Sequence, residues 1–345
     1  INLSDFSFFR LNLNILANNC VFHYIYCLKA RLTSLIPFFK STFIINPNYA
    51  LMKKITFTFL LLITLVIFCQ IINIPGDYNT IQEGIDNAEP GDTILVAAGT
   101  YYENIYAQSK NFVLASHFIL EQDTNYISQT IIDGNAVGSV INFENLSFQS
   151  EIIGFTIHNG DATGGFGGGI RLVESSPILR NLLIKDNVAG SGGGIYCTNW
   201  SLNLYQVKIV NNTALNFGGG IFTMNAALDM NHCTLTGNHA LTAAGGMFRF
   251  NIEDVINYGM NVNYCSIKGN TAETQTAGLF FRRTEGVAMV EINLMGCVFE
   301  NNYAASNGAL QIRGEEVGYH IENCKFIHNQ VDSYSAGLAF IMGCS

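Results

Sequence analysis

Basic residues are scarce in this chain of 345 residues. Only 17 residues are Lys or Arg against 26 Asp or Glu, and charged residues of both signs make up 12% of the sequence. Beyond residue 69 the balance is 11 basic against 25 acidic residues, a net charge of −14. Because a nucleic-acid-binding surface needs clustered positive charge, we expect no nucleic acid partner.

The sequence also lacks an apolar run long enough to cross a bilayer. The run at residues 55–68 has 14 residues, whereas a spanning helix needs about 20. It follows Met52, Lys53 and Lys54, and a short basic start before such a run is typical of a secretory signal peptide. We predict a signal peptide at 52–69, an exported protein in the extracellular space or at a bacterial cell surface or outer membrane, and no transmembrane span in the mature region. Residues 66–69 resemble a lipoprotein cleavage box loosely, and ordinary cleavage near Cys69 is the favoured alternative.

Two end segments are set apart from the fold. Residues 1–51 precede the predicted signal peptide, contain one acidic residue and show no lasting period. We interpret them as upstream translation that does not belong to the protein. At the other end, the sequence stops within a motif that earlier copies continue through, so we expect a truncated C-terminus.

Apolar periodicity of helix length is missing from the repeats that follow. Two anchors recur instead at intervals of 25–32 residues. One is an asparagine, at Asn159, Asn187, Asn212, Asn238, Asn270, Asn302 and Asn329. The other is a run of small residues before an aliphatic residue, in copies that end at Ile170, Ile195, Ile221, Met247, Leu279, Leu310 and Leu338.

Residues before each asparagine alternate with period two, which indicates a strand with one buried face. Three positions before it stand Thr156, Ile184, Ile209, Leu235, Ile267, Phe299 and Phe326, and five before it stand Gly154, Leu182, Val207, Cys233, Cys265, Cys297 and Cys324. A second strand follows the small residues and a third precedes the cysteine position. Short strands with turns too brief for crossover helices predict an all-β parallel solenoid, with the aliphatic anchors stacked as an inward ladder. We expect the asparagines to occupy left-handed turns as the chain leaves each strand.

The glycine-rich stretch 164–169 is then a set of corners. A phosphate-binding loop would be followed by a helix, and none is predicted. A calcium-binding solenoid repeat would place Asp where Gly169 stands.

The pattern resembles the right-handed parallel β-helix domains of the pectate-lyase-like superfamily, over nearly all of residues 75–345. The segment 80–105 resembles the opening segment of that group, and Thr80 with Glu83 forms a capping-box signature for a short helix that would close the end of the solenoid. The GGGI copies, with FENN and FIHN, further resemble the GGAI and FxxN repeats of polymorphic outer-membrane proteins. We therefore predict a cap and first coil at 70–125 and β-helix repeats at 126–345.

Cys233, Cys265, Cys297 and Cys324 share one predicted inward position. In-register strands hold them about 4.8 Å apart, while a disulfide needs Cβ atoms about 3.5–4.5 Å apart, so we expect free thiols. The turn histidines, His158, His232, His239 and His328, are interpreted as solvated residues, and we predict no metal site.

One candidate site is an outward aromatic stripe, formed by Tyr196, Phe222, Phe248 and Phe280 in successive repeats. A contiguous apolar stripe indicates a binding surface or a covered one, and loop or chain cover and a glycan platform are both open. The same counting points Arg249 inward, which implies a bulge or an alignment shifted by one residue.

Longer loops in the late repeats place Glu253, Glu285 and Glu316 at one position and Arg282 and Arg313 at another. They form either a weak acidic site, with Ca²⁺ the only cofactor considered, or a solvated loop with compensating charges, which is favoured. No residue set matches a lyase or hydrolase motif. The leading hypothesis is thus a secreted or surface β-helix that binds or displays, with a polysaccharide or cell-surface glycan as candidate partner. The alternative is a polysaccharide lyase or glycoside hydrolase of the pectate-lyase-like superfamily.

Overall fold

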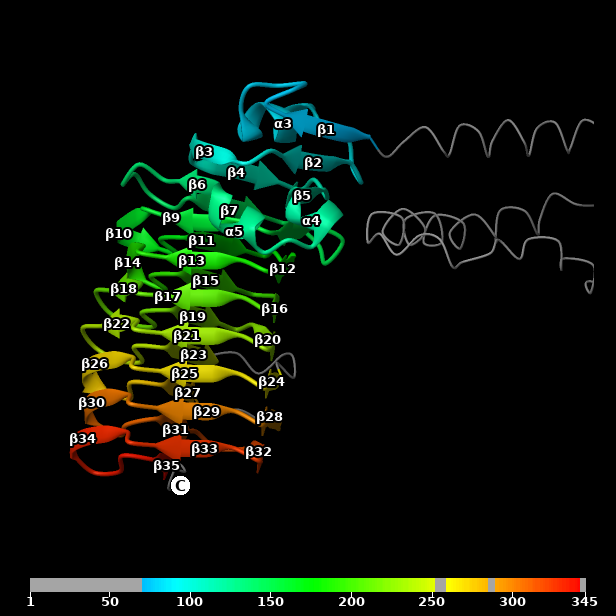
Figure 1. The fold of residues 1–345 in the computed structure, drawn as a ribbon. Coiled ribbons are helices and arrows are strands. Elements are labelled where there is room, and N and C mark those ends of the chain that lie inside the picture. The colour runs from blue at the N-terminus through cyan, green and yellow to red at the C-terminus, as the bar shows by residue number, and fades with distance from the viewer. Residues whose placement is uncertain (1–69, 252–258, 285–288, 342–345) are drawn as a thin grey trace, which may run out of the picture. The chain divides into compact units, whose positions relative to one another are not determined.

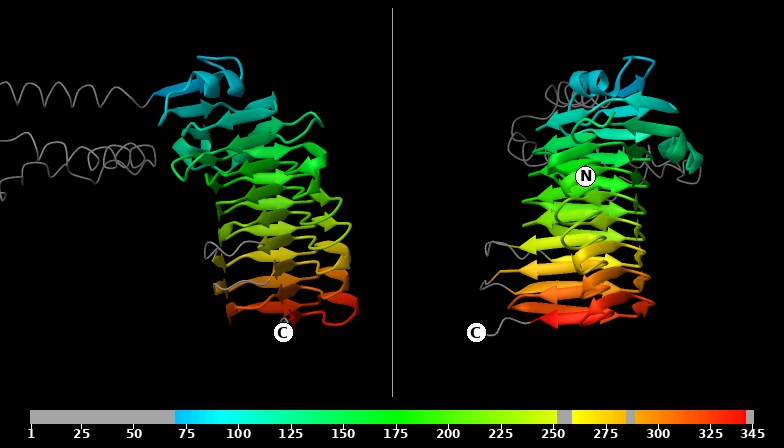
Figure 2. Two further views of the ribbon diagram at one scale, coloured as in Figure 1. Left: turned by 180° about the vertical axis from the view of Figure 1, so that it is seen from behind. Right: turned by 90° about the vertical axis from the view of Figure 1, so that its left-hand side faces the viewer.

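The predicted strands are present, and they stack coil upon coil. The computed structural model describes residues 70–251, 259–284 and 289–341. The chain divides into two compact units, and the larger one, Gln70–Phe118 with Asp123–Ser345, holds the strands. Its named strands pair in parallel in four sheets, and each full coil visits sheets A, B, D and C in turn (Figures 1 and 2). The all-β right-handed parallel β-helix is confirmed.

The strands of each sheet follow in chain order. Sheet A contains β1 (Ile71–Ile74), β2 (Thr93–Val96), β5 (Val113–Ser116), β8 (Glu151–Ile153), β12 (Ile178–Arg180), β16 (Ser201–Tyr205), β20 (Ala227–Asn231), β24 (Met260–Asn263), β28 (Val290–Met295) and β32 (Val317–Glu322). Sheet B contains β3 (Gly99–Tyr102), β6 (Thr130–Asp133), β9 (Thr156–His158), β13 (Leu183–Lys185), β17 (Lys208–Val210), β21 (Thr234–Thr236), β25 (Ser266–Lys268), β29 (Val298–Glu300) and β33 (Lys325–Ile327). Sheet C contains β4 (Ile105–Gln108), β7 (Ile141–Glu144), β11 (Ile170–Val173), β15 (Ile195–Thr198), β19 (Ile221–Met224), β23 (Met247–Asn251), β27 (Leu279–Arg283), β31 (Leu310–Arg313) and β35 (Leu338–Ile341).

Sheet D is the one that the sequence pattern did not predict. It contains β10 (Asp161–Phe166), β14 (Val188–Ser191), β18 (Thr213–Ala214), β22 (His239–Ala240), β26 (Thr271–Gln275), β30 (Tyr303–Ser306) and β34 (Gln330–Ser333). Each repeat therefore has four strands and not three. Two strands of sheet D are only two residues long, which is too short for an alternating pattern to be visible.

The described residues also form three helices: α3 (Ile81–Asn87), α4 (Phe118–Glu121) and α5 (Asn125–Gln129). In α3 the capping box is formed as predicted, because Thr80 accepts from the Glu83 backbone N–H and the Glu83 side chain accepts from the Thr80 N–H. Ile81 and Ile85 are buried against the first strands of the core. None of the helices in the described ranges is long and apolar enough to cross a membrane.

Most of the anchor asparagines are buried in the solenoid and do not occupy the turns predicted from the sequence. Asn187, Asn212, Asn238, Asn270 and Asn302 are completely buried and stack along the solenoid as a ladder. Each Nδ2 donates to the Oδ1 of the asparagine in the next coil, at 2.9–3.0 Å, and also to a strand carbonyl of the preceding coil. From Asn212 onward, each Oδ1 also accepts the backbone N–H of the asparagine before it, as Asn238 does from Asn212 at 3.0 Å. The prediction of left-handed turns at these positions was wrong for this set.

The left-handed residue is the one just before the ladder, for example Asp186, Asn211 and Gly237. The first copy was also misaligned by one residue. Asn159 itself has φ +60°, and Gly160 takes the ladder position, where its N–H donates to Asn187 Oδ1 at 2.9 Å. The register of sheet B accordingly pairs Ile157, and not Thr156, with Ile184.

The predicted glycine corners are confirmed at Gly167, which has φ +69°, and in the equivalent copies, but Gly164 and Gly165 lie in strand β10 and not in a corner. Gly218 has φ +65°, a conformation that residues with a Cβ atom rarely adopt. Gly220 packs so closely on the next coil that a Cβ atom there would lie 2.6 Å from the Gly246 oxygen. Such backbone contact, and not phosphate or calcium binding, accounts for these glycines. The aliphatic anchors stack beside them as predicted, and Ile170, Ile195, Ile221, Met247, Leu279 and Leu310 are all buried.

Arg249 lies inside the core without any change of register. It pairs with Thr223 on one side and Phe281 on the other, and its side chain is completely buried. Nη1 donates to the Gly259 carbonyl at 3.1 Å, and the guanidinium carbon lies 5.3 Å from the centre of the Phe281 ring. Burial lowers the pKa of Arg249 to about 9. Neither the bulge nor the misalignment proposed from the sequence is needed.

The cysteine ladder points inward as predicted. Cys233, Cys265 and Cys297 are buried, Cys324 is half-buried, and all four are free thiols, as is Cys197. Cys265 Sγ accepts the Cys233 N–H at 3.4 Å. The hydrogen bond with Cys233 raises the pKa of the Cys265 thiol, and burial raises it further. Burial also raises the pKa of Cys197 to about 12.

We predict that replacing one rung of the asparagine ladder weakens the fold severely. Asn238→Leu removes the acceptor used by Asn212 and the Nδ2 donor to the Ile209 carbonyl and the Asn270 Oδ1, which keeps only the backbone N–H of residue 238. The expected loss in the free energy of unfolding is at least about 3 kcal/mol in urea titrations. Asn211→Gly is the matched control, because Asn211 is exposed and already has φ +54°, and its effect should stay below about 1 kcal/mol. Equal losses in the free energy of unfolding for the two variants would contradict a stabilising role of the ladder hydrogen bonds.

The thiols should be unreactive in the folded protein. Iodoacetamide should leave Cys197, Cys233, Cys265 and Cys297 unlabelled, because their side chains are buried away from the reagent, and should label all of them after denaturation without reductant. Peptide mass mapping measures both states. A disulfide between adjacent coils would show that the strands are not in the observed register.

Candidate functional site

The outward aromatic stripe exists, but its rings are covered. Tyr196, Phe222, Phe248 and Phe280 are register neighbours on the outer face of sheet C. They form a cluster separate from the main core, and only 2–6% of each is exposed. The chain's own corner residues Phe217, Ala243 and Ala244 pack on them. Of the two alternatives that the sequence left open, the structure shows loop cover and not an exposed platform.

The cluster is built by ring stacking between coils. The ring centres of Phe222 and Phe248 lie 5.6 Å apart, and Phe217 stacks on Phe248 at 5.0 Å. At one end Phe166, 44% exposed, stacks on Tyr196 at 4.7 Å. The cluster therefore fastens the loops between sheets D and C to the outside of the solenoid.

The predicted charged site is only partly described. Arg282 and Arg313 are register neighbours on sheet C and both are exposed, as expected, with the Arg282 guanidinium 5.4 Å from the Phe250 ring centre. Glu316 is exposed too, and its carbonyl accepts from Arg283 Nη1 at 2.8 Å. Glu253 and Glu285 lie outside the described residues. Within residues 70–251, 259–284 and 289–341 there is no group of three or more His, Cys, Asp or Glu side chains arranged to hold a metal.

The histidines divide into two kinds. His232 and His328 are exposed residues of left-handed turns, as predicted. His158 and His239 lie in strands instead, where His158 Nε2 is 3.4 Å from Asp133 and His239 Nδ1 is 2.8 Å from Thr271 Oγ1.

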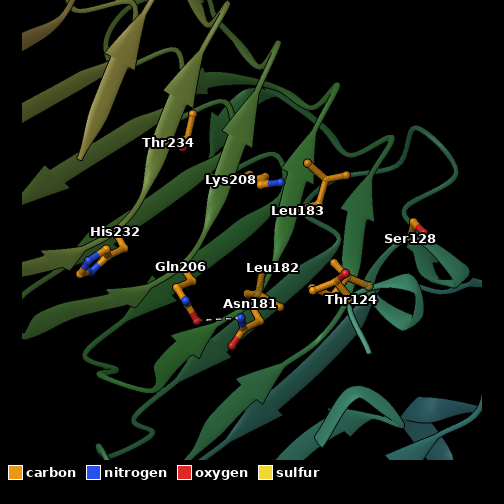
Figure 3. A pocket seen from close by; sticks show the side chains of 10 residues that line it. Thr124, Ser128, Asn181, Leu182, Leu183, Gln206, Lys208, His232 and Thr234 are labelled. Atoms are coloured by element: carbon orange, nitrogen blue, oxygen red, sulfur yellow. Dashed lines mark hydrogen bonds between the residues drawn. The ribbon is translucent and has the colours of Figure 1, made fainter. Parts of the chain in front are cut away.

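A groove of about 480 Å³ lies between α5 and the outer face of sheet B (Figure 3). We call it the α5 groove. Its lining residues come from three neighbouring segments of the chain: Thr124, Ile127 and Ser128 at the helix, Asn181, Gln206 and His232 in the turns between sheets A and B, and Leu182, Leu183, Lys208 and Thr234 in or beside sheet B.

Each wall of the α5 groove is held in place by local contacts. The Ile127 carbonyl accepts from Thr156 Oγ1 at 2.7 Å, which ties α5 to sheet B. Across the turns, Asn181 Nδ2 donates to Gln206 Oε1 at 3.0 Å, as the dashed line in Figure 3 shows. The His232 ring packs on the Tyr264 ring of the next coil with centres 5.2 Å apart.

The electrostatics of the α5 groove are set by Lys208. Its side chain is exposed, and no carboxylate of the described chain lies within ion-pair distance of its Nζ. None of the ten lining residues is acidic, in a chain that carries more acidic than basic residues. The groove therefore offers a cation, an imidazole and several hydroxyl and amide groups above an apolar floor.

Sequence reasoning missed the α5 groove because it does not arise from the repeat. Lys208 and Thr234 belong to ordinary outward positions of a strand, and the pattern gives no reason to single them out. What makes a groove there is α5, a short helix in the segment between β5 and β6. A departure from the 25–32-residue period was the only available signal.

Comparisons with known proteins gave one match to a family model and a likeness to a solved structure. The repeat of the Chlamydia polymorphic membrane protein (Chlamydia_PMP) matches residues 181–198, which include the ladder residue Asn187 and one GGGI corner. Among solved structures, the crystal structure of an alginate lyase from Paenibacillus sp. str. FPU-7 is similar at 12% identity and a TM-score of 0.35, over 75% of this chain and 98% of that one. No curated protein matches. The chain is a parallel β-helix repeat protein, and its residues 181–198 are similar to the polymorphic membrane protein repeat.

We predict that the covered stripe is structural. Phe222→Ser should lower the free energy of unfolding by about 3 kcal/mol, because the ring is 6% exposed and packed on both sides. Phe166→Ser, at the exposed end of the same cluster, should cost about 1 kcal/mol. Thermal and urea unfolding of both variants measure the difference, and a Phe222→Ser variant as stable as the unaltered protein would refute the structural role.

Proposed function

We propose that this protein is an exported surface β-helix that binds glycans in the α5 groove without cleaving them. The observation that carries the proposal is the groove itself, which is lined by one cation without an ion-pair partner among the described residues and by several hydrogen-bonding side chains. Sugars are bound by such polar groups together with apolar surface, and Leu183 and Ile127 supply the latter. Export rests on the predicted signal peptide at 52–69 and accords with the polymorphic membrane protein repeat.

The ligand that suits the α5 groove best is a polysaccharide with carboxylate groups. Lys208 supplies the positive charge, His232 adds a second when protonated, and no lining carboxylate opposes an anion. Glycoside hydrolysis uses a pair of carboxylic residues, and the ten lining residues include none. Binding without hydrolysis is therefore the function that we propose first for the α5 groove.

Cleavage is the second candidate, and one observation favours it. Lys208 and His232 are both bases when deprotonated, and both line the groove, so one of them is placed to remove a proton from a bound sugar. A lyase of this kind forms unsaturated products, which absorb in the ultraviolet.

We predict that Lys208→Ala weakens binding to alginate and polygalacturonate at least tenfold, and that raising the salt concentration weakens binding to the unaltered protein. Isothermal titration at several salt concentrations measures both effects. Lys185→Ala is the matched control, because Lys185 lies one coil away on sheet B and is paired with Asp186 at 3.1 Å. If Lys208→Ala leaves the affinity for both polymers unchanged, the α5 groove is not the binding site. If unsaturated products form and their formation depends on Lys208 or His232, the protein is a lyase and not only a binding protein.

A further inference from the structure

The outer face of sheet A carries a regular array of amide side chains. Four successive strands, β16, β20, β24 and β28, place Asn203, Asp229, Asn261 and Asn293 in register at one outward position. Asn231 and Asn263 lie in register at the next outward position of β20 and β24. These six half-buried residues are called the amide patch. The labels of the four strands follow one another down the right side of Figure 1.

Much of the hydrogen-bonding capacity of the amide patch is unused. Asn231 Nδ2 donates to Asp229 Oδ1 at 2.7 Å, and Asn293 Nδ2 donates to Asn261 Oδ1 at 3.0 Å. The side chains of Asn203 and Asn263 have no hydrogen-bond partner among the described residues. Because each amide has two N–H donors and a carbonyl acceptor, the patch presents both kinds of group to solvent.

The charge of the amide patch selects against anions. Asp229 is its one ionisable member, and Glu291 lies exposed in the neighbouring outward position of β28. Partial burial raises the pKa of Asp229, and the hydrogen bond from Asn231 opposes that shift. Arg180 and His320 lie on the same face, and each is within ion-pair distance of a carboxylate, of Glu151 at 3.2 Å and of Glu322 at 3.1 Å. The carboxylates of Asp229 and Glu291 have no such cationic partner among the described residues, so the patch disfavours an acidic polymer. It accepts hydroxyl groups, which donate to the carboxylate and carbonyl oxygens and accept from the amides.

The spacing of the amides and two exposed tyrosines at the edge of the patch indicate that a ligand would run along the solenoid. Successive amides lie about 4.8 Å apart along the solenoid, close to the length of one hexose unit in an extended chain. Tyr205 and Tyr264, 39% and 55% exposed, stand at the edge of the patch, and the Tyr264 ring is held by the His232 ring. Exposed aromatic rings of fixed orientation stack on the apolar faces of sugars at small entropic cost.

We propose that the amide patch binds a neutral polysaccharide chain that runs along the solenoid, with about one sugar unit per coil. It is a second binding surface, on a different sheet and for a ligand of different charge from that of the α5 groove. The two surfaces would let one molecule hold two kinds of glycan.

The test uses two soluble polymers, neutral hydroxyethyl cellulose and acidic alginate, in affinity gel electrophoresis and titration calorimetry. The double variant Asn203→Ala with Asn261→Ala should lose at least tenfold in affinity for the neutral polymer and keep its affinity for alginate. Asn216→Ala, an exposed amide on the sheet D side, is the matched control and should change neither. Tyr264→Ser should weaken neutral binding as well, and circular dichroism with thermal unfolding verifies that all variants fold.

The outcomes separate the two surfaces. Absence of neutral binding by the unaltered protein, or neutral binding that survives in the double variant, overturns the amide patch, whatever the Lys208 variant does to alginate. Loss of neutral binding in the double variant supports the patch even if alginate binds elsewhere or not at all. Neutral binding lost equally in Asn216→Ala would show a general effect of the substitutions and overturn the proposal too.

Discussion

The buried asparagine ladder is the contact on which the rest of this molecule depends. A slip of one residue between coils would turn every core residue outward, so burial of the core already disfavours it. The ladder fixes the register further, because each asparagine satisfies a backbone N–H, a strand carbonyl and the next asparagine at once. A slipped coil would leave these groups buried and unsatisfied, which is far more costly than the bonds are favourable.

Once the register is held, every outward position becomes a column as well. This single consequence explains both the covered aromatic stripe and the amide patch. Aromatic residues in a column stack ring on ring and gather a second, external core beneath the corner loops. Amides in a column remain half in solvent and keep donors and acceptors in a regular row. The same geometry thus makes a structural cluster or a recognition surface, and the chemistry of the repeated residue decides which.

The sequence predicted the fold well because repetition shows the same rule many times. Ile170 and its equivalents, the cysteine positions and the glycine corners were each seen in several copies, so an inward column could be read directly. Features that depend on a neighbouring coil were read less well. The burial of the anchor asparagines, the cover over Phe222 and the burial of Arg249 all depend on what lies 25–32 residues away. Sheet D went unseen because strands as short as β18 have no period.

The candidate sites show a second limit on what the sequence can predict, and its cause is physical. The α5 groove comes from a break in the repetition. The break is α5, where the Ile127 carbonyl accepts from Thr156, so that the helix lies beside sheet B and the ordinary strand residues Lys208 and Thr234 line a groove. The amide patch is the opposite case, since it needs no break and arises from the repetition itself. A repeat protein can therefore carry two binding surfaces of different origin, one where the repeat fails and one where it holds.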